Sequence, residues 1–261
     1  MNVGFMRIIN KYDRFLLEEI VKRNFSSKYK DSALGIFWSV LRPLLLMIVF
    51  TIIFSTMFGG SIEYFPVYFL SGRCIFEFFT GAVHTSMDSI KGNKNIILRT
   101  PVPKYIFILG SIISEFYNFI ISVVLLILVM IVINVPFNVM IMPLSIIPVF
   151  SLLMMITGWG LILSIVSVYY TDIQHLWSVA TTVLMYASAI FYPMSLVPEP
   201  YRSILMLNPM YWIVDQFRCF IYQGIIPQLG YIINSLLISA MILVIGIIIF
   251  KKYVNVVSMK L

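Results

Sequence analysis

The chain has 261 residues, of which 61% are hydrophobic and only 11% are charged, with a formal net charge of +7. Soluble domains contain about 45–50% apolar and about 25% charged residues, so this composition excludes a water-soluble protein and predicts an integral membrane protein. Because one helical crossing of a bilayer needs about 20 apolar residues, we expect residues 1–261 to form a single transmembrane domain of a handful of spans.

Motifs for catalysis and for cofactor binding are missing from the sequence. The chain contains no Gly-Lys dipeptide, and a P-loop requires one, so any energy from ATP must enter through another subunit that binds ATP and Mg. The two cysteines and two histidines lack the close spacing of metal ligands, and we expect no cofactor in this chain. Hydrolase and metalloprotease motifs are absent as well, which leaves an intramembrane enzyme as a minor alternative.

The N-terminal segment 7–25 carries a polar stripe of helical period. Charged residues recur three or four positions apart, and they are Arg7, Lys11, Arg14, Glu18 and Lys22. Apolar residues occupy most of the remaining surface, which predicts an amphipathic helix in the cytoplasmic membrane interface. The alternative is a basic anchor without a helical role.

Hydropathy along the chain predicts six transmembrane helices, and therefore an all-α integral membrane protein. The expected spans are residues 34–58, 64–88, 105–133, 139–169, 174–197 and 231–250. They are continuously apolar and do not alternate with a period of two, which excludes a β-barrel. The second span contains Arg73 and Glu77, and His84 and Asp88, each pair four residues apart, and we expect each pair to associate on one helix face.

The distribution of basic residues sets the expected orientation. Fourteen of the eighteen Lys and Arg residues lie in the first 33 residues, in the 89–104 connection or after Phe250. Since Lys and Arg concentrate on the cytoplasmic side of membrane proteins, both termini and the loop 91–104 are predicted to be cytoplasmic. The external segment 198–230 is rich in proline but retains large apolar residues, which indicates two short helices broken near Asn208-Pro209 that dip into the outer leaflet.

Several residues within the predicted spans are candidates for binding. Glu115 lies about 16 Å along the third span from Lys104, with Asn118 beside it, and could bind a substrate hydroxyl or a neighbouring helix. Arg42 could extend to the cytoplasmic interface. Aromatic residues make up 15% of the chain, and they could form interface belts, pack between helices, or line a sugar path in which rings stack on pyranose faces. Our choices for such a path are Phe69, Phe76, Tyr186 and Tyr192.

The segment Ser27–Leu45, SKYKDSALGIFWSVLRPLL, continues into Phe50–Ser55 and resembles the opening signature of ABC-2 type permease subunits. These subunits belong to exporters of O-antigen, capsule and teichoic acid polymers. Further matching segments follow in the same order, namely Leu70–Gly72, Lys94–Lys104, Tyr169–Ile173 and Asn208–Tyr211. Two departures stand out: Arg73–Glu77 replaces an apolar stretch that is common in the family, and Thr171 stands where arginine is common.

The resemblance implies a channel formed by a homodimer, with two separate ABC ATPase subunits and short external gate helices at about residues 196–222. It implies that the ATPase contact lies in one cytoplasmic segment, made of Asn93, Lys94, Asn95, Ile96, Ile97, Leu98 and Arg99. The implied substrate is a lipid-linked polysaccharide, carried across the bacterial cytoplasmic membrane.

A basic rim could attract the pyrophosphate of such a lipid, because each cation near a membrane surface contributes about 1 kcal/mol. The residues that we expect in this rim are Lys22, Arg23, Lys28, Lys30 and Arg99. The competing function is a secondary transporter or channel without an ATPase, although the chain shows no matching pair of interrupted helices in two inverted halves. A membrane scaffold is the third alternative.

Overall fold

The computed structural model describes residues 11–30, 32–57 and 62–260, and within these ranges it is almost entirely helical and contains no strand. This confirms the all-α fold class. The expected start of the N-terminal helix, residues 7–10, lies outside the described residues. The helices are α1 (Lys11–Tyr29), α2 (Trp38–Met57), α3 (Phe65–Gly92), α4 (Lys94–Arg99), α5 (Tyr105–Val132), α6 (Ile146–Tyr169), α7 (Ile173–Ala187), α8 (Glu199–Leu205), α9 (Pro209–Arg218) and α10 (Leu229–Lys260).

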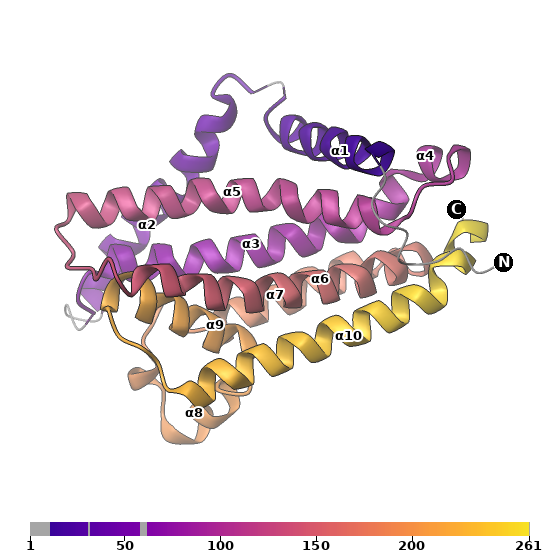
Figure 1. Ribbon diagram of the computed structural model, residues 1–261. Coiled ribbons are helices and arrows are strands. Elements are labelled where there is room, and N and C mark those ends of the chain that lie inside the picture. The colour runs from indigo at the N-terminus through magenta and orange to yellow at the C-terminus, as the bar shows by residue number, and fades with distance from the viewer. Residues whose placement is uncertain (1–10, 31, 58–61, 261) are drawn as a thin grey trace.

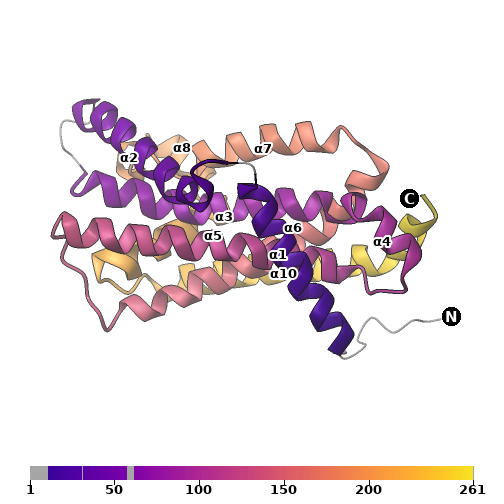
Figure 2. The ribbon, with the colours of Figure 1, turned by 90° about the horizontal axis from the view of Figure 1, so that it is seen from above.

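Four long helices, α3, α5, α6 and α10, form the body of the bundle (Figure 1). Helix α3 is the central one, because it packs against both α5 and α6 and buries most of its residues. Helix α1 packs on the outside of α5 and crosses it obliquely (Figure 2). Helix α2 leaves the bundle at an angle, and few residues of its apolar stretch are fully buried in the protein.

Glycines allow α6 and α10 to approach until their backbones touch. A Cβ atom on Gly158 would lie 2.6 Å from the carbonyl oxygen of Ile242, and a Cβ on Gly246 would lie 2.5 Å from the carbonyl oxygen of Gly158. Membrane helices associate through such small residues because lipid provides no hydrophobic drive between them.

Among the described residues, four segments are long and apolar enough to cross a membrane, namely Gly35–Phe54, Tyr105–Val132, Met142–Tyr169 and Leu229–Val256, so the chain is a multi-pass membrane protein. Helix α3 has 28 residues and is about 42 Å long, which is sufficient to cross, but it carries the ionisable residues noted above.

The expected fifth span differs from the structure. Helix α7 has 15 residues and ends at Ala187, so it is about 22 Å long, which is shorter than a bilayer core of about 30 Å. The chain turns immediately afterwards, where Ala189 adopts a left-handed φ of 50°. The expected span 174–197 is therefore a short helix followed by an irregular segment, and a count of six membrane-crossing helices stays a prediction.

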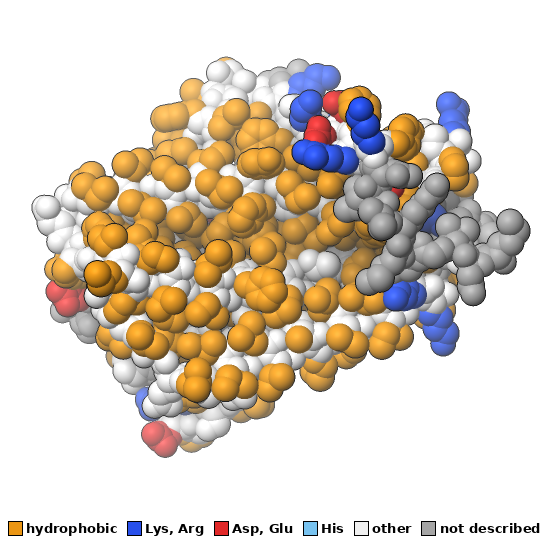
Figure 3. Space-filling view, viewed as in Figure 1, with side chains coloured by type: hydrophobic (Ala, Val, Ile, Leu, Met, Phe, Trp, Pro, Cys, Tyr) orange, Lys and Arg blue, Asp and Glu red, His pale blue; other side chains and the backbone are white. Residues whose placement is uncertain are grey.

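Basic side chains lie over α1 and at the end of the bundle that carries α4 and the C-terminal end of α10 (Figures 1 and 3). Lys94, Arg99, Lys251 and Lys252 are all exposed there, and we call this region the basic end. The visible surface along the long helices is mostly hydrophobic (Figure 3), as expected for helices that face lipid. The opposite end carries the α5–α6 connection.

Candidate functional site

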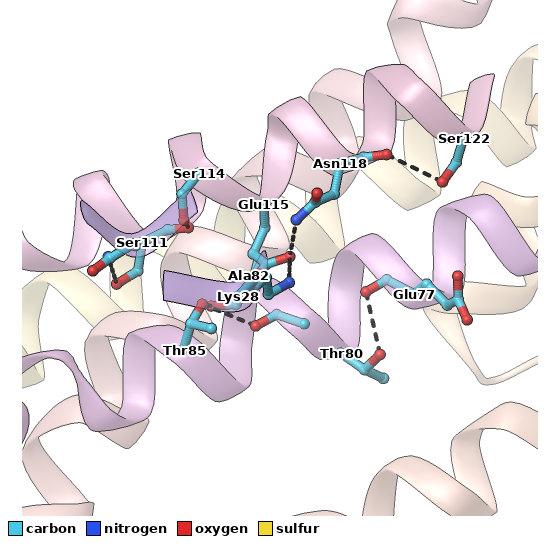
Figure 4. A network of polar contacts seen from close by, with 12 residues as sticks. Lys28, Glu77, Thr80, Ala82, Thr85, Ser111, Ser114, Glu115, Asn118 and Ser122 are labelled. Atoms are coloured by element: carbon cyan, nitrogen blue, oxygen red, sulfur yellow. Dashed lines mark hydrogen bonds and ion pairs between the residues drawn. The ribbon is translucent and has the colours of Figure 1, made fainter. Parts of the chain in front are cut away.

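An ion pair between an exposed lysine and a buried glutamate fastens α1 to α5. The Lys28 Nζ atom lies 2.7 Å from Oε2 of Glu115, whose side chain is buried in the bundle. The Asn118 amide donates a second hydrogen bond of 3.1 Å to the same oxygen, and all three side chains converge in Figure 4. Of the two roles considered for Glu115, the structure therefore shows the contact with a neighbouring helix.

Space for this carboxylate comes from α3. A Cβ atom on Gly81 would lie 3.2 Å from Oε2 of Glu115, so a larger residue would press on the ion pair. The Tyr29 hydroxyl donates a 2.8 Å hydrogen bond to Oδ1 of Asn118. Burial raises the pKa of the Tyr29 phenol, so the hydroxyl keeps its proton and acts as a donor. The last turn of α1 is thus held by both an ion pair and a neutral hydrogen bond.

A second contact joins α1 to the beginning of α4. The Arg23 guanidinium donates a 2.8 Å hydrogen bond to Oδ1 of Asn93, and the Asn93 amide donates one of 2.6 Å to the carbonyl oxygen of Ser89 in α3. Asn93 is buried, so it connects three helices at one point. The start of α4 is therefore linked to both α1 and α3 through one side chain.

The segment expected to contact the ATPase forms the short helix α4. Ile97 is buried against the bundle, whereas Leu98 is 54% exposed. Lys94, Asn95 and Arg99 are exposed as well, and Ile96 is partly covered. One side of α4 is thus anchored, and the other presents an apolar residue among polar ones, which is a surface suited to a protein partner.

The five cations expected in the pyrophosphate rim have different surroundings. Lys28 and Arg23 are engaged with Glu115 and Asn93, as described above, and Lys22 lies 3.4 Å from Oε1 of Glu19. Lys30 and Arg99 are exposed. Three of the five cations thus have partners within the protein, and lipid binding at these positions stays a prediction.

Two adjoining cavities form a groove between α2, α3 and the end of α7, and both are lined by Trp38, Arg42 and Arg73. The larger one, of about 700 Å³, is mainly apolar, and its other lining residues are Leu45, Leu46, Phe50, Phe54, Met185, Tyr186, Phe191 and Tyr192. The smaller one, of about 390 Å³, is more polar and reaches Lys28, Glu77, Thr80, Glu115, Asn118 and Ser122. We call the two together the α2–α3 groove.

The ionisable pairs expected within α3 have different outcomes. Arg73 and Glu77 form an ion pair of 2.8 Å, which confirms that prediction, and Arg73 also donates a hydrogen bond to the sulfur of Met185. The prediction for the second pair is wrong: within the described residues no ion pair joins His84 to Asp88, and the Asp88 carboxylate accepts a hydrogen bond from Gln174 of α7. The side-chain amide of Gln174, and not His84, is therefore the partner of Asp88.

The four aromatic residues chosen for a sugar path fall into two groups. The side chains of Phe69 and Phe76 are 0% and 4% exposed, and Phe69 packs against Phe50 and Phe191, so these two rings face protein in this structure. Tyr186 is 57% exposed, and it lines the α2–α3 groove together with Tyr192. The structure therefore provides two tyrosines in position to meet a ligand in the groove.

The segment 198–230 contains the two expected short helices, α8 and α9. Asn208 caps α9, because its side-chain oxygen accepts a hydrogen bond from the backbone N–H of Met210. A π-helical turn, Cys219–Gln223, follows α9. A cavity of about 920 Å³ lies beside this turn, between the beginning of α3 and the α5–α6 connection.

Arg218 at the end of α9 is the residue that the sequence analysis missed. Its guanidinium is buried and donates hydrogen bonds to the carbonyl oxygens of Tyr68, Ala189 and Ile190. A Cβ atom on Gly72 would lie 2.7 Å from Nη2 of Arg218, so Gly72 makes room for it. The sequence did contain a signal for Arg218, because it is a cation among large apolar residues of a membrane protein. Such a cation marks a site of structural or functional importance.

The chain is similar to several proteins that are named as export permeases or transport proteins. The chain is 24% identical over 234 residues to the O-antigen export system permease protein RfbA of Myxococcus xanthus, with 87% of each chain covered. It is 25% identical over 240 residues to the protein of the same name from Klebsiella pneumoniae, with 91% of each covered. The polysialic acid transport protein KpsM of Escherichia coli is 24% identical over 239 residues, which cover 90% of this chain and 92% of KpsM.

The family model described as ABC-2 type transporter matches residues 16–222. The matched region begins in α1 and extends through the bundle to the π-helical turn after α9, so it includes the Lys28–Glu115 pair, α4, the α2–α3 groove and Arg218. The chain is therefore a non-catalytic membrane subunit that belongs to the ABC-2 type transporter family.

Proposed function

We propose that this chain is the channel-forming subunit of an ATP-driven exporter that moves a lipid-linked polysaccharide outward across the bacterial cytoplasmic membrane. It works as a homodimer with two ABC ATPase subunits. The names of the relatives, which export O-antigen or transport polysialic acid, support the substrate class. The missing P-loop supports a separate ATPase.

The observation that carries the proposal is the connection of α4 with the rest of the protein. Leu98 and Arg99 face outward on α4, while Asn93 at its beginning is tied to α1 through Arg23 and to α3 through Ser89. Helix α1 is in turn tied to α5 through Lys28 and Glu115. A force applied to the exposed side of α4 therefore reaches three helices through short polar contacts.

Helix α2 supports the homodimer. Its stretch Gly35–Phe54 is strongly apolar, and few of its residues are fully buried in one chain, so the side that does not pack on the bundle is available to a second copy or to lipid. A dimer that used this surface would place the two α2–α3 grooves near the shared axis.

The experiment uses the chain co-expressed with a candidate ABC ATPase subunit. The pair is purified in mild detergent and reconstituted into liposomes with a lipid-linked polysaccharide on one side. We expect ATP-dependent appearance of the polymer on the other side and none with the chain alone. Transport by the chain alone without ATP contradicts the proposal and favours a secondary transporter or channel.

A further inference from the structure

We infer that the cavity beside the π-helical turn binds sugar units of the polymer after they have crossed the membrane, and that it selects neutral sugars over acidic ones. This cavity of about 920 Å³ lies between the beginning of α3, the α5–α6 connection and the turn Cys219–Gln223, and we call it the external cavity. The inference rests on the function proposed above and adds to it a second binding site and a class of sugar.

The external cavity lies at the end of the protein opposite to the basic end, because the α5–α6 connection is located there (Figure 1). Since Lys and Arg mark the cytoplasmic side, the cavity opens to the outside. It shares no lining residue with the α2–α3 groove. Its volume is in the upper part of the range of about 300–1,000 Å³ that is usual for ligand sites, so it has room for more than one small group.

The lining of the external cavity combines aromatic rings with polar side chains. The rings are those of Tyr64, Phe137 and Tyr222, and the polar side chains are those of Asn138, Ser195 and Gln223. Ring faces stack on the apolar C–H faces of a pyranose, and amides and hydroxyls exchange hydrogen bonds with sugar hydroxyls. This mixture is the one that a saccharide requires.

Several of the polar groups are available to a ligand. The Oδ1 atom of Asn138 accepts a hydrogen bond from the backbone N–H of Met140, but its Nδ2 atom donates to none of the described residues. Ser195 accepts a hydrogen bond at its backbone carbonyl oxygen, while its hydroxyl is engaged with no other described residue. The Gln223 amide donates a long hydrogen bond of 3.4 Å to the Tyr222 hydroxyl, and its carbonyl oxygen is left for a sugar hydroxyl.

Two walls of the external cavity have uncommon backbone conformations. Tyr64 adopts a left-handed conformation with φ of 54°, which is unfavourable for a bulky residue. Tyr222 belongs to the π-helical turn, a conformation that is rare and frequent at functional sites. Gly224 ends this turn with φ of 66°, and a Cβ atom on it would lie 3.3 Å from Cβ of Asn138. Such strained positions persist where the surroundings enforce them, and they concentrate at ligand sites.

A third wall is a tyrosine ring that the protein holds in place. The Tyr68 hydroxyl lies 2.7 Å from the carbonyl oxygens of both Ala189 and Tyr192. The guanidinium of Arg218 lies 3.5 Å from the centre of the same ring, although Arg218 is not among the residues that line the cavity. A ring that is already fixed loses little conformational freedom when a ligand binds.

The charge of the external cavity determines which sugars it accepts. Among the described residues that line it, Glu63 is the charged one, and no cation accompanies it. A carboxylate accepts hydrogen bonds from the hydroxyls of a neutral sugar, but it repels the carboxylate of an acidic sugar or a phosphate group. The cavity therefore suits an uncharged part of a polysaccharide and disfavours sialic acid or polyol phosphate.

The test measures binding of tetrasaccharides to the full chain in phosphatidylcholine nanodiscs by saturation-transfer difference NMR, with empty nanodiscs as background. Maltotetraose and chitotetraose are the neutral probes, and α2,8-linked tetrasialic acid is the acidic one. We expect weak binding of the neutral probes and much weaker binding of tetrasialic acid. Absence of binding by both neutral probes, or equal binding of tetrasialic acid, overturns the inference.

An aromatic substitution locates the binding. We expect Tyr222→Leu to weaken binding of the neutral probes about three- to tenfold, because the stacking face is lost, and Tyr222→Phe, which keeps the ring, to weaken it less. The matched control is Tyr201→Leu. It changes a tyrosine of the neighbouring helix α8 that is 63% exposed and does not line the cavity, and it should leave binding unchanged.

A charge substitution tests the selectivity through a gain of binding. Glu63 is exposed, so Glu63→Gln should fold normally and strengthen binding of tetrasialic acid several-fold, because the repulsion is removed. The control Glu199→Gln removes an exposed carboxylate that pairs with Arg202 at 3.6 Å and should have no effect. Glu63→Gln keeps the inference testable if Tyr222→Leu does not fold. Unchanged tetrasialic acid binding in Glu63→Gln overturns the selectivity, and unchanged neutral binding in folded Tyr222→Leu overturns the site.

Export of polymer separates the sources of the sugar and the two proposals. Tyr222→Leu should lower surface polymer at normal levels of folded protein, and normal export by a variant that has lost binding overturns the polymer as the ligand. The function proposed above is judged by export of the wild type with its ATPase. Normal wild-type export with binding that does not depend on Tyr222 overturns the external site alone, whereas Tyr222-dependent binding without any wild-type export overturns the exporter.

Discussion

Arg23 and Asn93, which are 70 residues apart in the chain, are joined by a hydrogen bond of 2.8 Å. This bond connects the helix on the outside of the bundle with the short helix that presents its free side to a partner. Since Asn93 also donates to the backbone of α3, its side chain connects the beginning of α4 with both α1 and α3.

Leu98→Asp should prevent the ATPase subunit from binding while leaving the chain folded. Leu98 is 54% exposed on α4, so the aspartate meets water in the free chain but is unfavourable in an apolar contact. The measurement is the fraction of ATPase that copurifies with the chain. Ile226→Asp, which changes an apolar residue that is 63% exposed in the connection before α10, is the control and should copurify normally; equal copurification in both variants would remove α4 from the interface.

Lys28→Gln should destabilise the protein by about 2 kcal/mol, because it leaves the buried Glu115 carboxylate without its cation. The double variant Lys28→Gln/Glu115→Gln should recover part of this loss, since no unpaired charge remains. The measurement is the thermal unfolding midpoint of the three variants in the same detergent. A double variant that is less stable than Lys28→Gln would show that the pair contributes through geometry and not through charge compensation.

Gly246→Ala should destabilise the protein by about 1–3 kcal/mol, because the added methyl group would overlap the backbone of α6 and force the two helices apart. The control is on the same helix: a Cβ atom on Gly230 meets no atom within 4 Å, so Gly230→Ala should be neutral or slightly stabilising. The measurement is the thermal unfolding midpoint of each variant. Similar midpoints for Gly246→Ala and Gly230→Ala would contradict the direct backbone contact between α6 and α10.

Changing aromatic residues to leucine should separate the groove from the core. Tyr186→Leu and Tyr192→Leu should lower polymer export roughly two- to tenfold at normal levels of folded protein, because an aromatic contact contributes about 0.5–1.5 kcal/mol beyond its area. Phe69→Leu and Phe76→Leu should instead lower the amount of folded protein, because both rings pack inside the bundle. Surface polymer and folded protein are measured together; normal export by both tyrosine variants would exclude stacking at these positions.

Local patterns in the sequence predicted the parts of this structure that depend on neighbours in the chain. Long apolar runs located the long helices, and the spacing of four residues predicted the Arg73–Glu77 pair, because both signals are contained within one helix. The break after α7 was missed because Ala189 adopts a left-handed conformation that alanine favours little, so its sequence gives no warning.

Contacts between segments that are far apart in the chain could not be predicted from the sequence. Glu115 was recognised as unusual, but its partner Lys28 lies 87 residues earlier, and only the path of α1 across α5 brings the two together. The contacts of Arg23 and Lys28 within the expected cationic rim were likewise not predicted, since residues of other segments engage both. Burial of Phe69 and Phe76 likewise depends on packing that a single sequence does not display.

The hydrogen bonds of Arg218 depend on its own side chain but not on the side chains of the residues that accept them. All three of its acceptors are backbone carbonyl oxygens, and every amino acid supplies that atom. Exchanges at Ala189 or Ile190 therefore leave the acceptors in place, whereas loss of the guanidinium or any side chain at Gly72 removes the attachment. The hydrogen bonds themselves therefore constrain the arginine and its glycine but place no demand on the side chains of Ala189 and Ile190.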